Sequence, residues 1–142
     1  MADCLRVMDY LVSCDDVDSQ KISLVGGDLA LFTAALRDSA SVLFYTPSLF
    51  YKALHKATAT QNYPLEEFND YLRSFPESID QISQTLAYFE PMNFASRVKS
   101  EVMLMEESEG DANDLAVSFS KEIERSGSKH SSYQDLSLIH IS

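Results

Sequence analysis

Hydrophobic residues in the first part of the chain recur at spacings that predict a helix followed by a strand. Within residues 2 to 13, Leu5, Met8 and Val12 fall on one stripe, as in an amphipathic helix. The segment from Lys21 to Gly26 is short and largely apolar, and it ends at a pair of glycines where the chain can turn. We therefore expect a short buried strand that leads into a tight bend.

The next segment predicts a buried helix and a second strand. Asp28 is a favourable N-cap for a helix that runs from Leu29 to about Arg37. The apolar residues of this helix lie on nearly all of its sides, which is typical of a helix enclosed in a core. Val42 to Tyr45 predicts another short strand, closed by Thr46-Pro47.

Two helices and a third strand are expected in the second half. Pro76 separates two apolar stripes with helical spacing: Leu65, Phe68, Leu72 and Phe75, then Ile79, Ile82, Leu86 and Phe89. Glu101 to Met105 predicts a strand, and about Asn113 to Arg125 predicts a further helix. The alternation of helices and strands indicates an α/β protein with a parallel sheet flanked by helices.

Composition and charge narrow the classes of function that the chain can have. The chain has 142 residues, 45% of them hydrophobic, which suits a single globular domain. Its formal net charge of −11 disfavours binding to nucleic acid or to an anionic membrane surface. No apolar run is long enough to cross a bilayer, and the first residues do not form a secretion signal. Cys4 and Cys14 lack metal-ligand spacing, so we expect reduced thiols in the cytoplasm.

Three stretches together resemble the acetyl xylan esterase / cephalosporin-C deacetylase family of α/β-hydrolases. The first, VMDYLVSCDDVDSQKISLVGG, is similar to the family's helix, Asp-rich turn and strand before the serine-bearing bend, called the nucleophile elbow. The second, LALFTAAL, resembles the helix after that elbow. The third and most specific, TLAYFEPMNFASRVKSEVMLM, resembles the segment that leads to the strand before the catalytic acid.

The resemblance covers about residues 3 to 125 and corresponds to the C-terminal part of a longer family domain. The upstream part of that domain supplies the first strands of the sheet and one oxyanion-hole donor. The resemblance therefore implies a partial α/β-hydrolase fold, with the N-terminal half missing. A strand that is central in the family would here become an exposed edge.

The resemblance also implies a serine nucleophile, but the chain lacks one at the expected place. Family members carry a Gly-Gly-Ser-Gln-Gly-Gly elbow, whereas this chain has a degenerate elbow, Gly26-Gly27-Asp28, shortened by four residues. Ser23 is close in sequence but belongs to the preceding strand, so we expect it to have a structural role there. In the family, a histidine takes the proton of the serine and an aspartate orients the histidine.

The acid of the triad is ambiguous. Asp111 lies within one residue of the family's acid position, yet the Cys-Pro-Pro that follows in the family is absent. Asp111 also fits a helix-capping role, because a carboxylate before a helix N-terminus is favoured. The acidic residues around it do not reproduce a calcium loop, so we expect a solvated loop and no metal or cofactor.

The histidine position raises a separate question. His140 falls near the family's distance from the acid, but it lies in the last seven residues, Leu136 to Ser142. That heptapeptide resembles one reading frame of a transposase adapter used in sequencing libraries. We therefore expect residues 136–142 to be a non-native tail and residues 1–135 to be the esterase-like domain. His55 and His130 have no catalytic motif beside them and are expected to be surface or packing residues.

These observations lead to two hypotheses of different classes. The first is a truncated, catalytically incompetent acetyl xylan esterase-like protein, whose intact relatives would hydrolyse small acetylated carbohydrates without a cofactor. The second is a non-catalytic hydrolase scaffold for interaction or homo-oligomerisation. A free-standing helical module is a third reading, since helices outnumber strands in the expected elements.

Overall fold

The computed structural model describes residues 1–46, 48–105, 117, 118, 121 and 125. The expected strands are present as β1 (Ile22–Gly26), β2 (Ala40–Tyr45) and β3 (Glu101–Leu104). The first two expected helices are α1 (Ala2–Ser13) and α2 (Asp28–Leu36). Between β2 and β3 lie α3 (Ala53–Ala59), α4 (Glu66–Ser74), the 3-10 turn η1 (Pro76–Ser78), α5 (Ile79–Ala87) and the 3-10 segment η2 (Pro91–Arg97). Helix α3 and segment η2 were not predicted by the sequence pattern.

The three strands form one parallel sheet, as the alternation of elements predicts. Their order is β1-β2-β3, so β2 is central and β1 lies at an edge of the described sheet. The register pairs Leu24 with Leu43 and Val25 with Phe44, and it shifts between Ile22 and Ser23. Residues 21–26 and 101–105 therefore share one parallel sheet without being neighbours, because β2 lies between them.

The core lies between one face of the sheet and the helices that cover it. Leu43, Tyr45 and Val102 of the sheet pack with Leu31 of α2 and with Val98, which follows η2. Five consecutive α2 residues, Leu31 to Ala35, are buried, as the all-round apolar pattern of this helix predicts. The sheet and α2 together therefore hold the bend between β1 and α2 in place.

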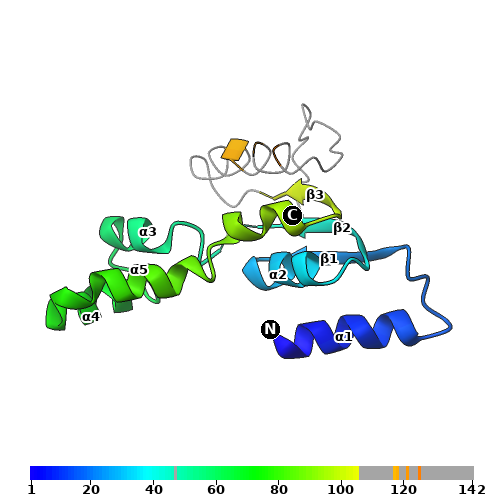
Figure 1. Cartoon of the computed structure of the whole chain (residues 1–142), viewed down its shortest axis with the longest axis horizontal. Helices are drawn as coiled ribbons and strands as arrows, with labels where there is room; N and C mark the ends of the chain where they lie inside the picture. Colours follow the sequence, from blue (N-terminus) through cyan, green and yellow to red (C-terminus); the bar gives the residue numbers. More distant parts are fainter. Residues whose placement is uncertain (47, 106–116, 119–120, 122–124, 126–142) are drawn as a thin grey trace.

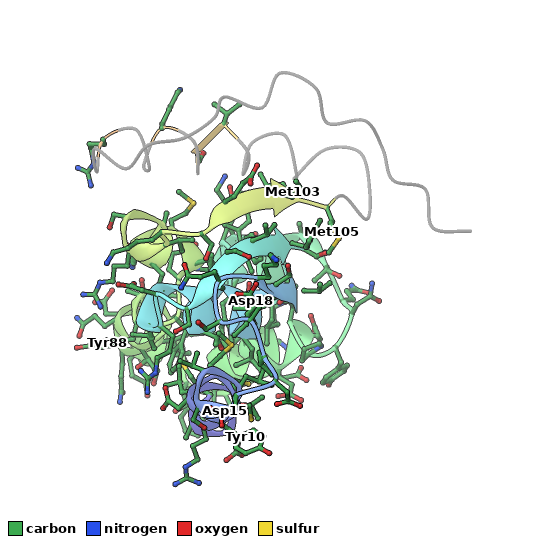
Figure 2. All side chains as sticks on the ribbon, turned by 90° about the vertical axis from the view of Figure 1, so that its right-hand side faces the viewer. Tyr10, Asp15, Asp18, Tyr88, Met103 and Met105 are labelled. Carbon is green, nitrogen blue, oxygen red and sulfur yellow. The ribbon has the colours of Figure 1, made fainter. Side chains whose placement is uncertain are left out.

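The apolar stripe of helix α1 is less buried than the sequence pattern predicts. Met8 is buried against Ile22 and Ala40, but Val12 is 42% exposed. The ion pair between Arg37 and Asp9 fastens α1 to the end of α2, with a distance of 2.7 Å between Arg37 Nε and Asp9 Oδ1. Figure 2 shows α1 at the opposite end of the molecule from Met103 on β3, with Tyr10 directed away from the sheet.

Helices α3, α4 and α5 form an arm that projects beyond the sheet, on the left in Figure 1. No residue of α4 or α5 is buried. Their apolar stripes lie where the spacing predicts, but Phe75 and Ile79 remain 48% and 44% exposed. Within the described residues, no helix has the length and hydrophobicity required to cross a membrane.

Candidate functional site

The bend between β1 and α2 occupies the place where a hydrolase would carry its nucleophile. Gly26 has a φ of +149°, a conformation that disfavours any residue with a side chain. Gly27 is the N-cap of α2, and a Cβ atom on it would lie 2.8 Å from Ser48 Oγ. Both glycines are therefore required by the bend itself, even though no serine follows them.

Asp28 is the first residue of α2 and is 3% exposed. Its Oδ1 accepts hydrogen bonds from the Tyr45 hydroxyl at 3.0 Å and the Ser48 backbone N–H at 3.4 Å, and its Oδ2 accepts one from the Phe50 N–H at 2.8 Å. The prediction of Asp28 as a side-chain N-cap is wrong. Its carboxylate turns away from the helix N–H groups because the loop after β2 supplies the donors instead.

The same buried region holds a second carboxyl group and two phenols. Burial raises the pKa of Tyr45, and the neighbouring Asp28 carboxylate raises it further. Burial also raises the pKa of Glu90, whose Oε2 accepts a hydrogen bond from the Lys52 N–H at 3.1 Å. Within the described part of the chain, the Tyr51 hydroxyl and Glu90 Oε1 are buried without a hydrogen-bond partner.

Of the serines and histidines considered from the sequence, the described ones, Ser23 and His55, do not meet at this bend. Ser23 lies inside β1, paired with Val42, and its side chain is exposed. His55 is exposed on α3, and no hydrogen bond in the described residues joins its imidazole to a serine or a carboxylate. Asp111, His130 and His140, together with residues 136–142, lie outside the described residues, so their predicted roles stay predictions.

The sequence pattern missed the partners that surround Asp28. Tyr45, Ser48 and Phe50 follow it by 17, 20 and 22 positions. Ser48 also accepts a hydrogen bond from the backbone N–H of Asp28, at 3.3 Å from Oγ. The only signal in the sequence was Thr46-Pro47, which predicted the end of a strand and so the place where the chain turns back.

The tyrosines of the second strand and of the helices after it fall into a buried group and an exposed group. Tyr45 and Tyr51 are buried in the core, whereas Tyr63 and Tyr71 are 65% and 48% exposed. The buried pair lies around the bend, and the exposed pair lies in the arm. The two groups therefore do not form one aromatic surface.

A parallel strand that turns through two glycines into a buried helix is the arrangement that carries the nucleophile in α/β-hydrolases. A family model for acetyl xylan esterase matches residues 1–113. The chain belongs to the acetyl xylan esterase family, which confirms the resemblance seen in the three sequence stretches. Membership of the family does not by itself make the chain an active esterase.

A solved structure shares the fold. The chain is similar to an acetyl xylan esterase from Paenibacillus sp. R4, with 30% sequence identity and a TM-score of 0.64. The match covers 72% of this chain and 35% of the solved one. The chain therefore spans about a third of the length of that relative.

Proposed function

We propose that this chain is a catalytically incompetent member of the acetyl xylan esterase family. The observation that carries the proposal is the side chain at the bend. Asp28 stands there in place of a serine, and its carboxylate is buried and hydrogen-bonded on both oxygens. A nucleophile must face the substrate, whereas the Asp28 carboxylate is buried and both of its oxygens accept hydrogen bonds from the fold itself.

The nearby hydroxyl groups do not replace the missing serine in this proposal. Ser48 lies at the bend, where its Oγ accepts a hydrogen bond from the Asp28 N–H. Ser23 is exposed within the edge strand β1 and belongs to the strand, not to the bend. Neither hydroxyl has a histidine within hydrogen-bond reach among the described residues, so neither has a general base.

In this proposal, the substrate that the family name implies is hydrolysed by longer members of the family. Since the chain spans 35% of its solved relative, hydrolysis of small acetylated carbohydrates requires groups beyond those described here. Both the oxyanion hole and the triad depend on several segments being held together. The part described here supplies the scaffold at the bend without the reacting groups.

The test is turnover of an aryl acetate by the purified chain. With 4-nitrophenyl acetate we expect no burst and no saturable rate, and the same background rate for Ser23→Ala and Ser48→Ala as for the unmodified chain. Saturable turnover that either substitution abolishes would overturn the proposal and would identify the nucleophile. The paired variants separate a strand serine from a serine at the bend.

A second candidate function, an interaction scaffold, is favoured by the exposed apolar surface of the arm. Tyr71, Phe75 and Ile79 are each more than 40% exposed, and Tyr71 packs only partly against Phe75, with ring centroids 5.0 Å apart. Light scattering coupled to size exclusion tests this candidate. We expect a mass that rises with concentration and that Phe75→Glu lowers, whereas Tyr88→Glu at another exposed ring leaves it unchanged. A monomer at all concentrations would contradict the candidate.

A further inference from the structure

The arm, residues 53–89, joins the rest of the molecule at one place. The chain enters the arm after Lys52 and leaves it at Glu90, and the backbone N–H of Lys52 donates to Glu90 Oε2 at 3.1 Å. Beside this bond the Phe50 ring stacks on the Phe89 ring, with centroids 5.3 Å apart and planes at 26°. We call these four residues the root of the arm. A unit whose entry and exit lie together has the connection of a hinged body.

The arm is held together by its own hydrogen bonds. Asn69 Nδ2 of α4 donates to the Ala57 carbonyl of α3 at 2.7 Å and to Glu66 Oε2 at 2.8 Å. The Tyr63 hydroxyl, in the loop before α4, donates to Asp70 Oδ2 at 2.7 Å. These bonds join α3, the loop after it and α4 into one body.

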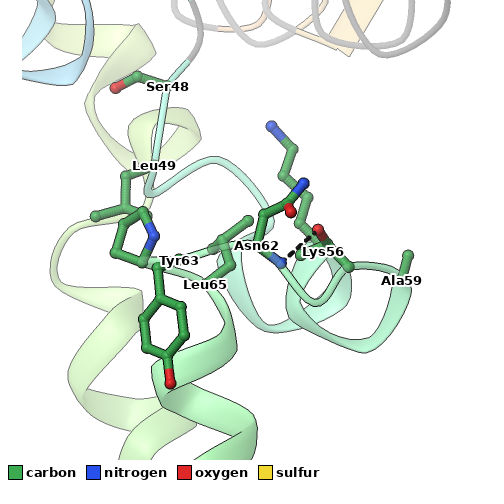
Figure 3. Close-up of a pocket in the computed structure, with 9 residues that line it drawn as sticks. Ser48, Leu49, Lys56, Ala59, Asn62, Tyr63 and Leu65 are labelled. Atoms are coloured by element: carbon green, nitrogen blue, oxygen red, sulfur yellow. Dashed lines mark hydrogen bonds between the residues drawn. The ribbon is translucent and has the colours of Figure 1, made fainter.

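Beyond the root, the arm packs little against the rest of the molecule. Among the described residues, α3, α4 and α5 make no extended contact with the sheet, α1 or α2. A pocket of about 520 Å³ lies between Ser48 and Leu49 of the loop after β2 and the arm residues Ala59 and Asn62, which Figure 3 shows on the other side. Since protein interiors are close-packed, a space of this size leaves room for the arm to turn.

The two chain connections at the root lie at the ends of elements. Lys52 is the N-cap of α3 and has a φ of +49°, in the left-handed region that residues with side chains rarely adopt. Glu90 is the N-cap of η2 and is extended. Hinges are a few residues of this kind, at loops or element ends, that absorb changes in φ and ψ. Lys52 and Glu90 are therefore the two points about which the arm can turn.

One side of the root is fixed to the bend between β1 and α2. The Phe50 N–H donates to Asp28 Oδ2 at 2.8 Å, and the Phe50 ring lies 6.3 Å from the ring of Phe32 on α2, measured between centroids. Phe89, by contrast, follows α5 at the end of the arm and is partly exposed. The stack of Phe50 on Phe89 therefore joins the arm to a fixed support.

We infer that the arm is a hinged unit that turns about Lys52 and Glu90, and that the stack of Phe50 on Phe89 holds it in the orientation of Figure 1. A turn toward Ser48 and Leu49 narrows the pocket. The inference goes beyond the proposed function, because it needs no catalytic group and holds for an active or an inactive chain.

The experiment measures distances between spin labels by double electron–electron resonance in the full chain, with Cys4 and Cys14 replaced by serine. The pair Ser41→Cys and Glu77→Cys spans the sheet and the arm, whereas Ala59→Cys and Glu77→Cys both lie in the arm; all three positions are exposed. We expect a distance distribution about twice as wide for the sheet-to-arm pair as for the pair within the arm. Dilution with unlabelled chain removes distances between molecules.

A variant at the root tests the role of the stack. Phe89→Ala should widen the sheet-to-arm distribution about 1.5-fold and leave the distribution within the arm unchanged, because it removes one stacked ring at the root. Phe75→Ala is the matched control. It removes an exposed ring that packs on Tyr71 within the arm, so it should change the sheet-to-arm distribution little.

Three results would overturn the inference. Equal widths for the two label pairs would show that the arm and the sheet are one rigid body. Equal widening of the sheet-to-arm distribution by Phe75→Ala and Phe89→Ala would assign the effect to general loosening of the arm. Widening of the distribution within the arm by Phe89→Ala would show that the arm is not one unit. Because the first comparison changes nothing at the root, it decides the matter even if Phe89→Ala fails to fold.

Discussion

The buried carboxylate of Asp28 connects parts of the chain that are far apart in sequence. It accepts hydrogen bonds from the end of β2 and from the loop that follows, while its own backbone begins α2. A buried carboxylate is tolerated only when donors surround it. The residue that occupies the place of a nucleophile therefore acts as a structural anchor.

Replacement of Asp28 by Asn should lower the free energy of unfolding by about 2 kcal/mol, because an amide cannot accept on both sides and leaves a buried N–H unpaired. Tyr45→Phe removes only one donor and should cost about 1 kcal/mol. Urea denaturation measures both changes. Equal stability of Asp28→Asn and the unmodified chain would contradict the anchoring role.

Glu90 gives a prediction that depends on pH. Because its pKa is raised in the folded chain, burial favours the protonated form. Its contribution to stability is fully present below pH 4.5, the ordinary value for glutamate, and is lost as pH rises through the raised pKa.

The substitution Glu90→Gln should therefore stabilise the chain at pH 7 and have little effect at pH 4. The gain should stay below about 1 kcal/mol, because the side chain is only partly buried and water screens it. Thermal unfolding of both proteins at the two pH values measures the difference. A Glu90→Gln variant that is less stable at pH 7 would show that the ionised form is favoured instead.

The bend between β1 and α2 depends on close approach of the loop after β2. A Cβ atom at Gly27 would lie 3.0 Å from Ser48 Cβ as well as 2.8 Å from Ser48 Oγ. Gly27→Ala should therefore cost about 1–2 kcal/mol through steric overlap.

The double variant Gly27→Ala/Ser48→Gly should recover part of this cost, since it removes the side chain that the new methyl group meets. A denaturation cycle over the two single variants and the double variant should give a coupling energy above about 0.5 kcal/mol. Additive costs would mean that the alanine acts through the backbone of the bend and not through contact with Ser48.

The helices of the arm illustrate what periodicity does and does not predict. The two apolar stripes of residues 65–75 and 79–89 gave helices α4 and α5 at nearly the expected bounds. An apolar stripe predicts a face that prefers burial, but it does not say which surface covers that face. In the described structure these stripes are only partly covered, so they are the strongest feature in favour of an interaction role.

Within the described residues, the sheet has an open edge along β1. Val25 in that strand is 69% exposed, and the segment Ile22–Gly26 contains no charged residue or proline that would discourage pairing with another strand. An uncharged edge of this kind favours self-association. The sequence predicted an exposed edge strand, because the resemblance covers only the C-terminal part of the family domain and leaves out the first strands of its sheet.

Val25→Lys should reduce self-association and change the free energy of unfolding by less than about 0.5 kcal/mol. The substitution makes the net charge of −11 less negative and so weakens the general repulsion between molecules. This effect of charge alone would increase self-association, not reduce it. Light scattering over a concentration series measures the effect. Val7→Lys on exposed α1 is the matched control, and an equal decrease in that variant would remove the edge strand from the explanation.

The sequence by itself determined the elements whose signals are local: the periodic helices, the three apolar strands, the glycine bend and the absence of a serine after it. The tertiary structure alone decided that β2 separates β1 from β3, that the arm stays exposed, and that Asp28 turns inward to Tyr45 and Phe50. The reason is physical. Periodicity records which face of an element prefers to be buried, whereas hydrogen-bond partners some twenty positions away are fixed only when the sheet and its loops pack together.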